Sequence, residues 1–166
     1  LREGVDDAAI HITGNTAVDA VLGIAGRLQR DESLRAGLDR RFAFLQQGRR
    51  VILVTGHRRE SFGGGFERIC AAIARLSQRQ DVQIVYPVHL NPNVRGPVFG
   101  ILGGMHNVHL IEPVDYLAFC YLMMRCHFIV SDSGGVQEEA PSLRKPVLVM
   151  RDVTERQEAV EAGVVR

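Results

Sequence analysis

Two glycine-rich loops carry most of the side chains that can bind or transfer chemical groups. GHRRESFGGG spans residues 56–65 after the apolar run VILVT, and DSGGVQEEA spans residues 132–140 after FIVS. Glycines let a ligand approach the bare backbone, and the second loop opens a helix whose free amides favour an anion. The two loops therefore predict a phosphate site.

Three residues of the second loop carry this prediction. Gly134 and Gly135 follow the strand end, and Glu139 lies four residues after Gly135, on the same face of the predicted helix. A carboxylate there is placed to accept hydrogen bonds from a ribose, which indicates a nucleotide. The alternative for a Gly-Gly pair is a tight turn beside a surface glutamate.

His57 is the strongest candidate in the first loop. It follows the strand immediately, where an imidazole can donate a hydrogen bond to a phosphate or to a leaving oxygen. Arg58 and Arg59 also fit a solvated basic loop.

Two further candidates have equally good structural explanations. Arg156 falls in the first turn of a helix predicted after the last strand, where Thr154 and Gln157 form a capping box. Phe119 belongs to YLAFCYLMM, which is typical of a helix with an apolar face, although a ring near the crevice can also stack on a base.

The apolar runs predict the fold that positions these residues. VILVT, VQIVYPV, VHLIE, FIVSD and PVLVM alternate with segments of helical length. This pattern predicts an α/β fold, a doubly wound parallel sheet in three Rossmann-like layers. In the usual strand order 3-2-1-4-5, the first and fourth strands are neighbours, so the two glycine-rich loops converge on the switch point.

The first fifty residues follow another pattern. AIHITGN, residues 9–15, predicts a strand and a turn without an evident partner sheet, and helical spacing follows over 16–29 and 32–46. EAVEAGVVR, residues 158–166, stops where another β–α connection usually continues, so we expect both ends of the sequence to be cut.

Composition excludes several classes of function. A net charge of +1 argues against a broad nucleic-acid surface. No apolar run reaches the ~18 to 20 residues of a membrane span. Cys70, Cys120 and Cys126 form no C-x-x-C pair and predict buried thiols in a reducing compartment, the cytoplasm. The histidines lack metal-site spacing, and G-x-G-x-x-G is missing after the first strand, so we expect neither a metal nor a nicotinamide cofactor.

Five stretches together resemble the bacterial non-hydrolysing UDP-N-acetylglucosamine 2-epimerases: HITGNTAVDAVL, TGHRRESFGGGFERI, YPVHLNPNVR, SDSGGVQEEAPSL and KPVLVMRDVTERQEAVEAG. The resemblance implies one half of a two-domain glycosyltransferase-B architecture. Residues 1–48 are then expected to be a remnant strand of the N-terminal domain plus linker helices, and residues 49–166 the C-terminal UDP-binding domain, truncated at its end. It also implies an isomerase that interconverts UDP-N-acetylglucosamine and UDP-N-acetylmannosamine, in cell-envelope polysaccharide biosynthesis. The family eliminates UDP to give 2-acetamidoglucal and then adds UDP back.

The resemblance assigns a role to each candidate residue. Ser133, Gly134 and Gly135 become phosphate ligands, Glu139 the ribose ligand, Arg156 a uridine-diphosphate contact, Phe119 a wall of the uridine pocket and His57 the catalytic neighbour of the diphosphate, while Arg58 and His89 match an allosteric site for a second UDP-N-acetylglucosamine. The chain departs from the family pattern at Ser61, Gly64 and Gln157, where asparagine, glutamate and proline are usual.

The acid and base carboxylates of the family belong to the N-terminal domain. The resemblance therefore implies that this chain supplies the half of the epimerase that binds UDP or UDP-N-acetylglucosamine, and that the enzyme is a homodimer at full length. Two alternatives stay open: a nucleotide-sugar binding module without catalysis, and a glycosyltransferase of the same architecture. EEAPSLRKPVLV suggests the glycosyltransferase, whereas GHRRE and TER count against it.

Overall fold

The parallel sheet is the centre of the molecule. The computed structural model describes residues 4–45, 47–151, 161 and 163. The strands are β1 (Arg50–Thr55), β2 (Val82–Pro87), β3 (Val108–Ile111), β4 (Phe128–Ser131) and β5 (Val147–Val149). Their order, β3-β2-β1-β4-β5, confirms the predicted doubly wound topology. Because β1 pairs with β4, the loops that follow these two strands lie side by side.

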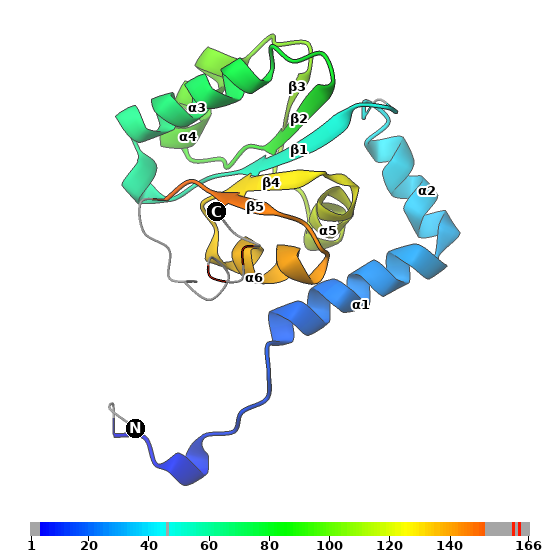
Figure 1. Ribbon diagram of the computed structural model, residues 1–166, viewed down its shortest axis with the longest axis vertical. Helices are drawn as coiled ribbons and strands as arrows, with labels where there is room; N and C mark the ends of the chain where they lie inside the picture. Colours follow the sequence, from blue (N-terminus) through cyan, green and yellow to red (C-terminus); the bar gives the residue numbers. More distant parts are fainter. Residues whose placement is uncertain (1–3, 46, 152–160, 162, 164–166) are drawn as a thin grey trace.

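Helices cover both faces of the sheet (Figure 1). On one face lie α3 (Gly64–Leu76) and α4 (Pro92–Leu102), and on the other lie α5 (Tyr116–Arg125) and α6 (Gly134–Ser142). The helix α1 (Thr16–Arg30) packs on α5 and α6, and α2 (Glu32–Arg41) leads from α1 towards β1. The helices predicted before residue 48 therefore share the core of the sheet domain.

Alternate residues of β1 supply the two cores. Ile52 and Val54 pack with Phe66 between the sheet and the α3–α4 layer. Leu53 joins Ile129 in the core on the α5–α6 face. This alternation is the period-two pattern of a strand that is buried on both faces.

The strand predicted over residues 9–15 is wrong. Among residues 4–15, Asp7–Ala9 form a short 3-10 helix and none forms a strand. These residues run away from the sheet as an arm (Figure 1), and Ile12 is 98% exposed. A strand needs a neighbour for its backbone amides and carbonyls, and no described strand lies beside the arm.

The three cysteines are free and buried, as predicted. Burial raises the pKa of the Cys70 and Cys120 thiols to about 11 and that of Cys126 to about 12. Since the thiolate is the reactive form, we expect all three to react with dithionitrobenzoate at neutral pH only after unfolding. A thiol that titrates rapidly in the native chain would contradict this packing.

None of the helices among the described residues combines the length and the apolar character that a membrane crossing requires.

Candidate functional site

Asp132 holds the turn that carries His57. Its side chain is fully buried, and its Oδ2 accepts hydrogen bonds from the backbone amides of His57 and Arg58, both at 2.8 Å. Tyr86, from β2, donates its hydroxyl to the carbonyl of Gly56 at 3.3 Å. The loop after β1 is thus attached to both neighbouring strands, and His57 leaves the sheet at a defined position.

The phosphate turn predicted at Ser133, Gly134 and Gly135 lies directly beside this loop. Ser133 is the N-cap of α6 but makes no side-chain cap, and its amide donates to Ser131 Oγ at 3.0 Å. A methyl group on Gly134 would lie 3.9 Å from Nη2 of Arg58. The start of α6 therefore has a guanidinium beside it, and both favour an anion at this point.

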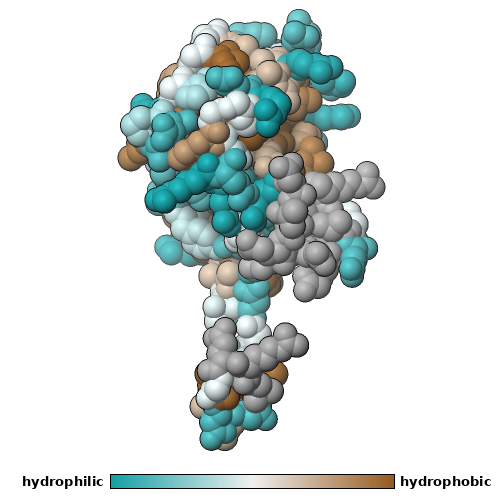
Figure 2. Space-filling model, turned by 90° about the vertical axis from the view of Figure 1, so that its left-hand side faces the viewer, coloured by the Kyte–Doolittle hydropathy of each residue, from teal (hydrophilic) through white to brown (hydrophobic). Residues whose placement is uncertain are grey.

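His57, His89 and Phe119 line one pocket of about 160 Å³ at the carboxyl ends of the strands. The imidazoles of His57 and His89 stack, with centroids 5.5 Å apart, and His57 is exposed. Phe119 is half-buried and also packs against the core, so both functions proposed for it from the sequence fit its position. The face shown in Figure 2 carries many hydrophilic side chains around this edge of the sheet.

Glu139 lies one turn into α6 and outside the lining of this pocket. Its Oε1 accepts a hydrogen bond from the hydroxyl of Tyr116 at 3.1 Å. Burial raises the pKa of the Glu139 carboxyl, and the hydrogen bond from Tyr116 opposes that shift. The carboxylate is partly desolvated, which strengthens any hydrogen bond that it makes to a ligand hydroxyl.

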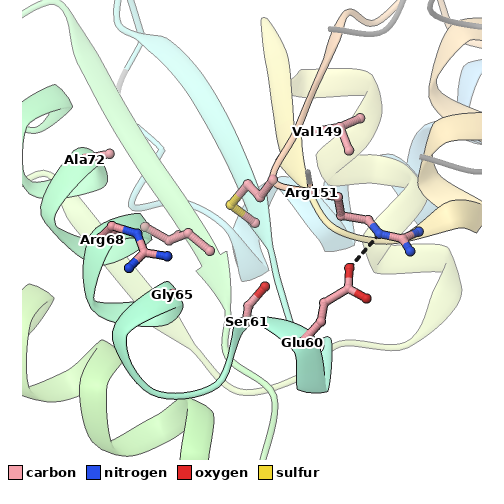
Figure 3. A pocket seen from close by; sticks show the side chains of 9 residues that line it. Glu60, Ser61, Gly65, Arg68, Ala72, Val149 and Arg151 are labelled. Carbon is pink, nitrogen blue, oxygen red and sulfur yellow. Dashed lines mark hydrogen bonds and ion pairs between the residues drawn. The ribbon is translucent and has the colours of Figure 1, made fainter. Parts of the chain in front are cut away.

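A larger groove of about 640 Å³ runs along α3 towards the end of β5 (Figure 3). Arg68 lies on its α3 side, and on the other side Nε of Arg151 donates to Oε1 of Glu60 at 2.7 Å. This ion pair joins the loop after β1, which carries Glu60, to the segment after β5, which carries Arg151. Apart from the charges themselves, no pattern in the sequence indicated this pair.

Two further predictions from the sequence concern Arg156 and the expected absence of a metal. Arg156 lies outside the described residues, as do Thr154 and Gln157. Among the residues that the structure does describe, His, Cys, Asp and Glu side chains form no group of three suited to a metal.

Sequence reasoning missed Asp132 and Tyr116. Asp132 directly follows the apolar run FIVS, and an acidic residue directly after a buried strand is a recognisable signal. No comparable signal in the sequence marks Tyr116, because its partner Glu139 is 23 residues away.

Comparison with known proteins identifies the family. The sequence model described as UDP-N-acetylglucosamine 2-epimerase matches residues 1–166, the whole chain. The chain belongs to this family. It is 61% identical over 167 residues to the probable UDP-N-acetylglucosamine 2-epimerase of Ralstonia nicotianae, and 58% identical to the Escherichia coli K12 epimerase. In both comparisons the whole chain matches 44% of the relative, so it spans less than half of their length.

Solved structures of the epimerase family have the same fold. The Neisseria meningitidis UDP-GlcNAc 2-epimerase, bound to UDP-GlcNAc, superposes with a TM-score of 0.92 at 48% identity, over 99% of this chain and 44% of that one. The Staphylococcus aureus MnaA–UDP structure gives 0.81 at 40% identity, over 99% and 43%. The wall teichoic acid polymerase TagF, at 16% identity and a TM-score of 0.52 over 87% and 34%, shares the fold alone.

Proposed function

We propose that this chain is the UDP-binding half of a UDP-N-acetylglucosamine 2-epimerase. One observation supports this most strongly. At the switch point, the buried Asp132 joins the loop of His57 and Arg58 to the glycine turn at the start of α6. An imidazole and a guanidinium thereby lie beside the first turn of α6, an arrangement that favours a diphosphate.

The proposed reaction interconverts UDP-N-acetylglucosamine and UDP-N-acetylmannosamine. The C2 hydrogen of the sugar is not beside a carbonyl, so direct proton removal leaves a poorly stabilised carbanion. Elimination of UDP followed by re-addition avoids that carbanion and makes the diphosphate the leaving group. Ser133, Gly134, Gly135, His57 and Arg156 would stabilise its charge, by about 3 kcal/mol for each well-placed donor.

The ribose and the base of the nucleotide are proposed to bind to other residues. Glu139 would bind the ribose hydroxyls, and Phe119 would form a wall of the uridine pocket. Arg58 and His89 are proposed to bind an activating second nucleotide sugar. Both line a pocket together with His57, so this sugar would lie close to the first.

The acid and the base are proposed to come from outside this chain, which covers 44% of its curated relatives. In this proposal residues 1–48 belong to the connection with that N-terminal domain, residues 49–166 form the nucleotide-binding domain, and the complete enzyme is a homodimer. Free, buried thiols support a cytoplasmic location.

The alternative function is a binding module that holds UDP and catalyses nothing. For this chain alone we favour it, because ligand binding without an acid and a base cannot drive elimination. A glycosyltransferase has weaker support, since the likeness to TagF concerns the fold only.

UDP is expected to raise the melting temperature of the chain. A ligand that binds only the native state stabilises it by mass action, by about 2.7 kcal/mol at a hundredfold excess over Kd. Thermal unfolding with and without UDP measures this, with uridine as the control that lacks the diphosphate. Identical curves at millimolar UDP would count against the proposal.

No epimerisation is expected when the chain alone is incubated with UDP-N-acetylglucosamine. Proton NMR of the sugar distinguishes the gluco from the manno product. Formation of the manno sugar would show that the chain holds its own acid and base, and would overturn the assignment of catalysis to another domain.

A further inference from the structure

The carboxylate of Asp132 has one oxygen that the loop does not use. Oδ2 accepts both loop amides, whereas Oδ1 is buried and has no hydrogen-bond partner within the described part of the chain. The ring of His57 lies beside this oxygen, with its Nδ1 3.5 Å from Oδ1. A buried carboxylate oxygen without a donor is costly, so a donor is expected to occupy this position.

We propose that Asp132 is a positioning residue that fixes both the backbone and the ring of His57. The carboxylate facing Nδ1 keeps the proton on that nitrogen. Nε2 is then the nitrogen that faces the ligand, and it donates to a diphosphate oxygen when a second proton binds there, so that the positive ring lies between two anionic acceptors. Only the ligand part of this inference rests on the proposed function, because the attachment of the loop and the state of the ring are properties of the chain itself.

The same residue links the two halves of the site. Asp132 directly precedes Ser133, so one side chain holds the loop of His57 and Arg58 while its own backbone leads into the glycine turn. A shift of the loop would move the imidazole and the guanidinium away from the start of α6 together. Loss of Asp132 should therefore affect diphosphate binding without removing any ligand contact.

Asp132→Asn separates the role of Asp132 in holding the loop from its role in keeping the proton on Nδ1 of His57. The amide oxygen of asparagine can still accept from the amides of His57 and Arg58, so the loop keeps its attachment. The amide nitrogen, however, is a donor and would face Nδ1, which must then become an acceptor. We expect the proton of the neutral ring to move from Nδ1 to Nε2.

Nitrogen-15 NMR of the imidazoles, at a pH where they are neutral, reads the tautomer directly. A His57→Gln spectrum assigns the signals of His57 among the six histidines of the chain. Pyrophosphate and UDP titrations of the same samples should show binding weakened at least about tenfold by Asp132→Asn, because the amide nitrogen facing Nδ1 opposes the charged ring and a neutral Nε2–H makes a weaker hydrogen bond to a phosphate oxygen. Asp81→Asn is the matched control, since Asp81 pairs with Arg79 at 2.8 Å before β2, at the opposite edge of the sheet.

The outcomes separate this inference from the proposed function. A tautomer change in Asp132→Asn together with weaker pyrophosphate binding supports the inference. An unchanged His57 tautomer overturns it, whatever the ligand does. If the wild-type chain binds neither ligand, the proposed function fails, and the tautomer alone still decides the role of Asp132. Asp132→Ala removes the acceptor of both loop amides, and a melting temperature no lower than that of Asp132→Asn would overturn the attachment of the loop by this side chain.

Discussion

Replacing Glu139 with alanine is expected to weaken UDP binding by about 1.5 to 3 kcal/mol and to leave pyrophosphate binding nearly unchanged. The carboxylate is half-buried on α6 and already accepts a hydrogen bond from Tyr116. In the proposed complex it accepts from the ribose hydroxyls, which pyrophosphate lacks. Calorimetric titration with UDP, uridine and pyrophosphate measures all three affinities on one protein.

Glu138→Ala is the matched control for this experiment. It removes the same charge from the adjacent residue, whose Oε2 accepts from Asn15 Nδ2 at 3.0 Å. Normal UDP binding by Glu139→Ala would remove the central residue of the proposed site.

Arg156→Ala is the complementary variant to Glu139→Ala. It should weaken the binding of UDP and of pyrophosphate alike, and its effect should be smaller at high salt, where screening has already reduced the attraction.

Acidification should reproduce part of the Glu139→Ala effect. Because burial raises the pKa of this carboxyl, it protonates at a higher pH than an exposed glutamate does. The protonated acid has lost acceptor capacity, so the advantage of UDP over pyrophosphate should be full at neutral pH and decline as the pH falls through this pKa. The Glu139→Ala variant should lack the decline.

Replacing Phe66 with alanine is expected to lower the free energy of unfolding by about 3 to 5 kcal/mol. Phe66 is fully buried between α3 and the sheet, 6.2 Å from the ring of Phe62, and its loss leaves a cavity. Urea denaturation followed by circular dichroism measures the change.

Phe99 provides the control for Phe66. It lies on α4, in the same layer, but is 41% exposed beside Arg95. Phe99→Ala should cost less than about 1 kcal/mol. Equal losses for the two variants would mean that Phe66 does not fill the core as described.

The sheet could be predicted because its signal is local. Each strand is a short apolar run, and the order of the strands follows from a rule on connections. The arm could not be predicted correctly, since AIHITGN has the composition of a strand and only a neighbour decides whether it pairs. Local pattern and tertiary context disagree there.

The loops of the candidate site could be predicted from the sequence, and its contacts less so. Glycines and charges beside strand ends made His57 and Gly134 candidates, yet the residue that joins their loops, Asp132, was not singled out. Its role depends on amides 74 and 75 residues away, which are brought together by the β1–β4 pairing. The pocket shared by His89 and Phe119 likewise exists only after the strands are assembled.

The central position of β1 has a consequence for ligand capture. Ile52 and Leu53 are paired on both sides, with β2 and with β4, so their amides should be among the slowest to exchange with solvent. The turn at Gly56 begins where this doubly paired ladder ends and is itself fastened by Tyr86 and Asp132. Little backbone freedom is left there to lose, so a diphosphate arriving at this edge would bind with a small entropic penalty from the protein.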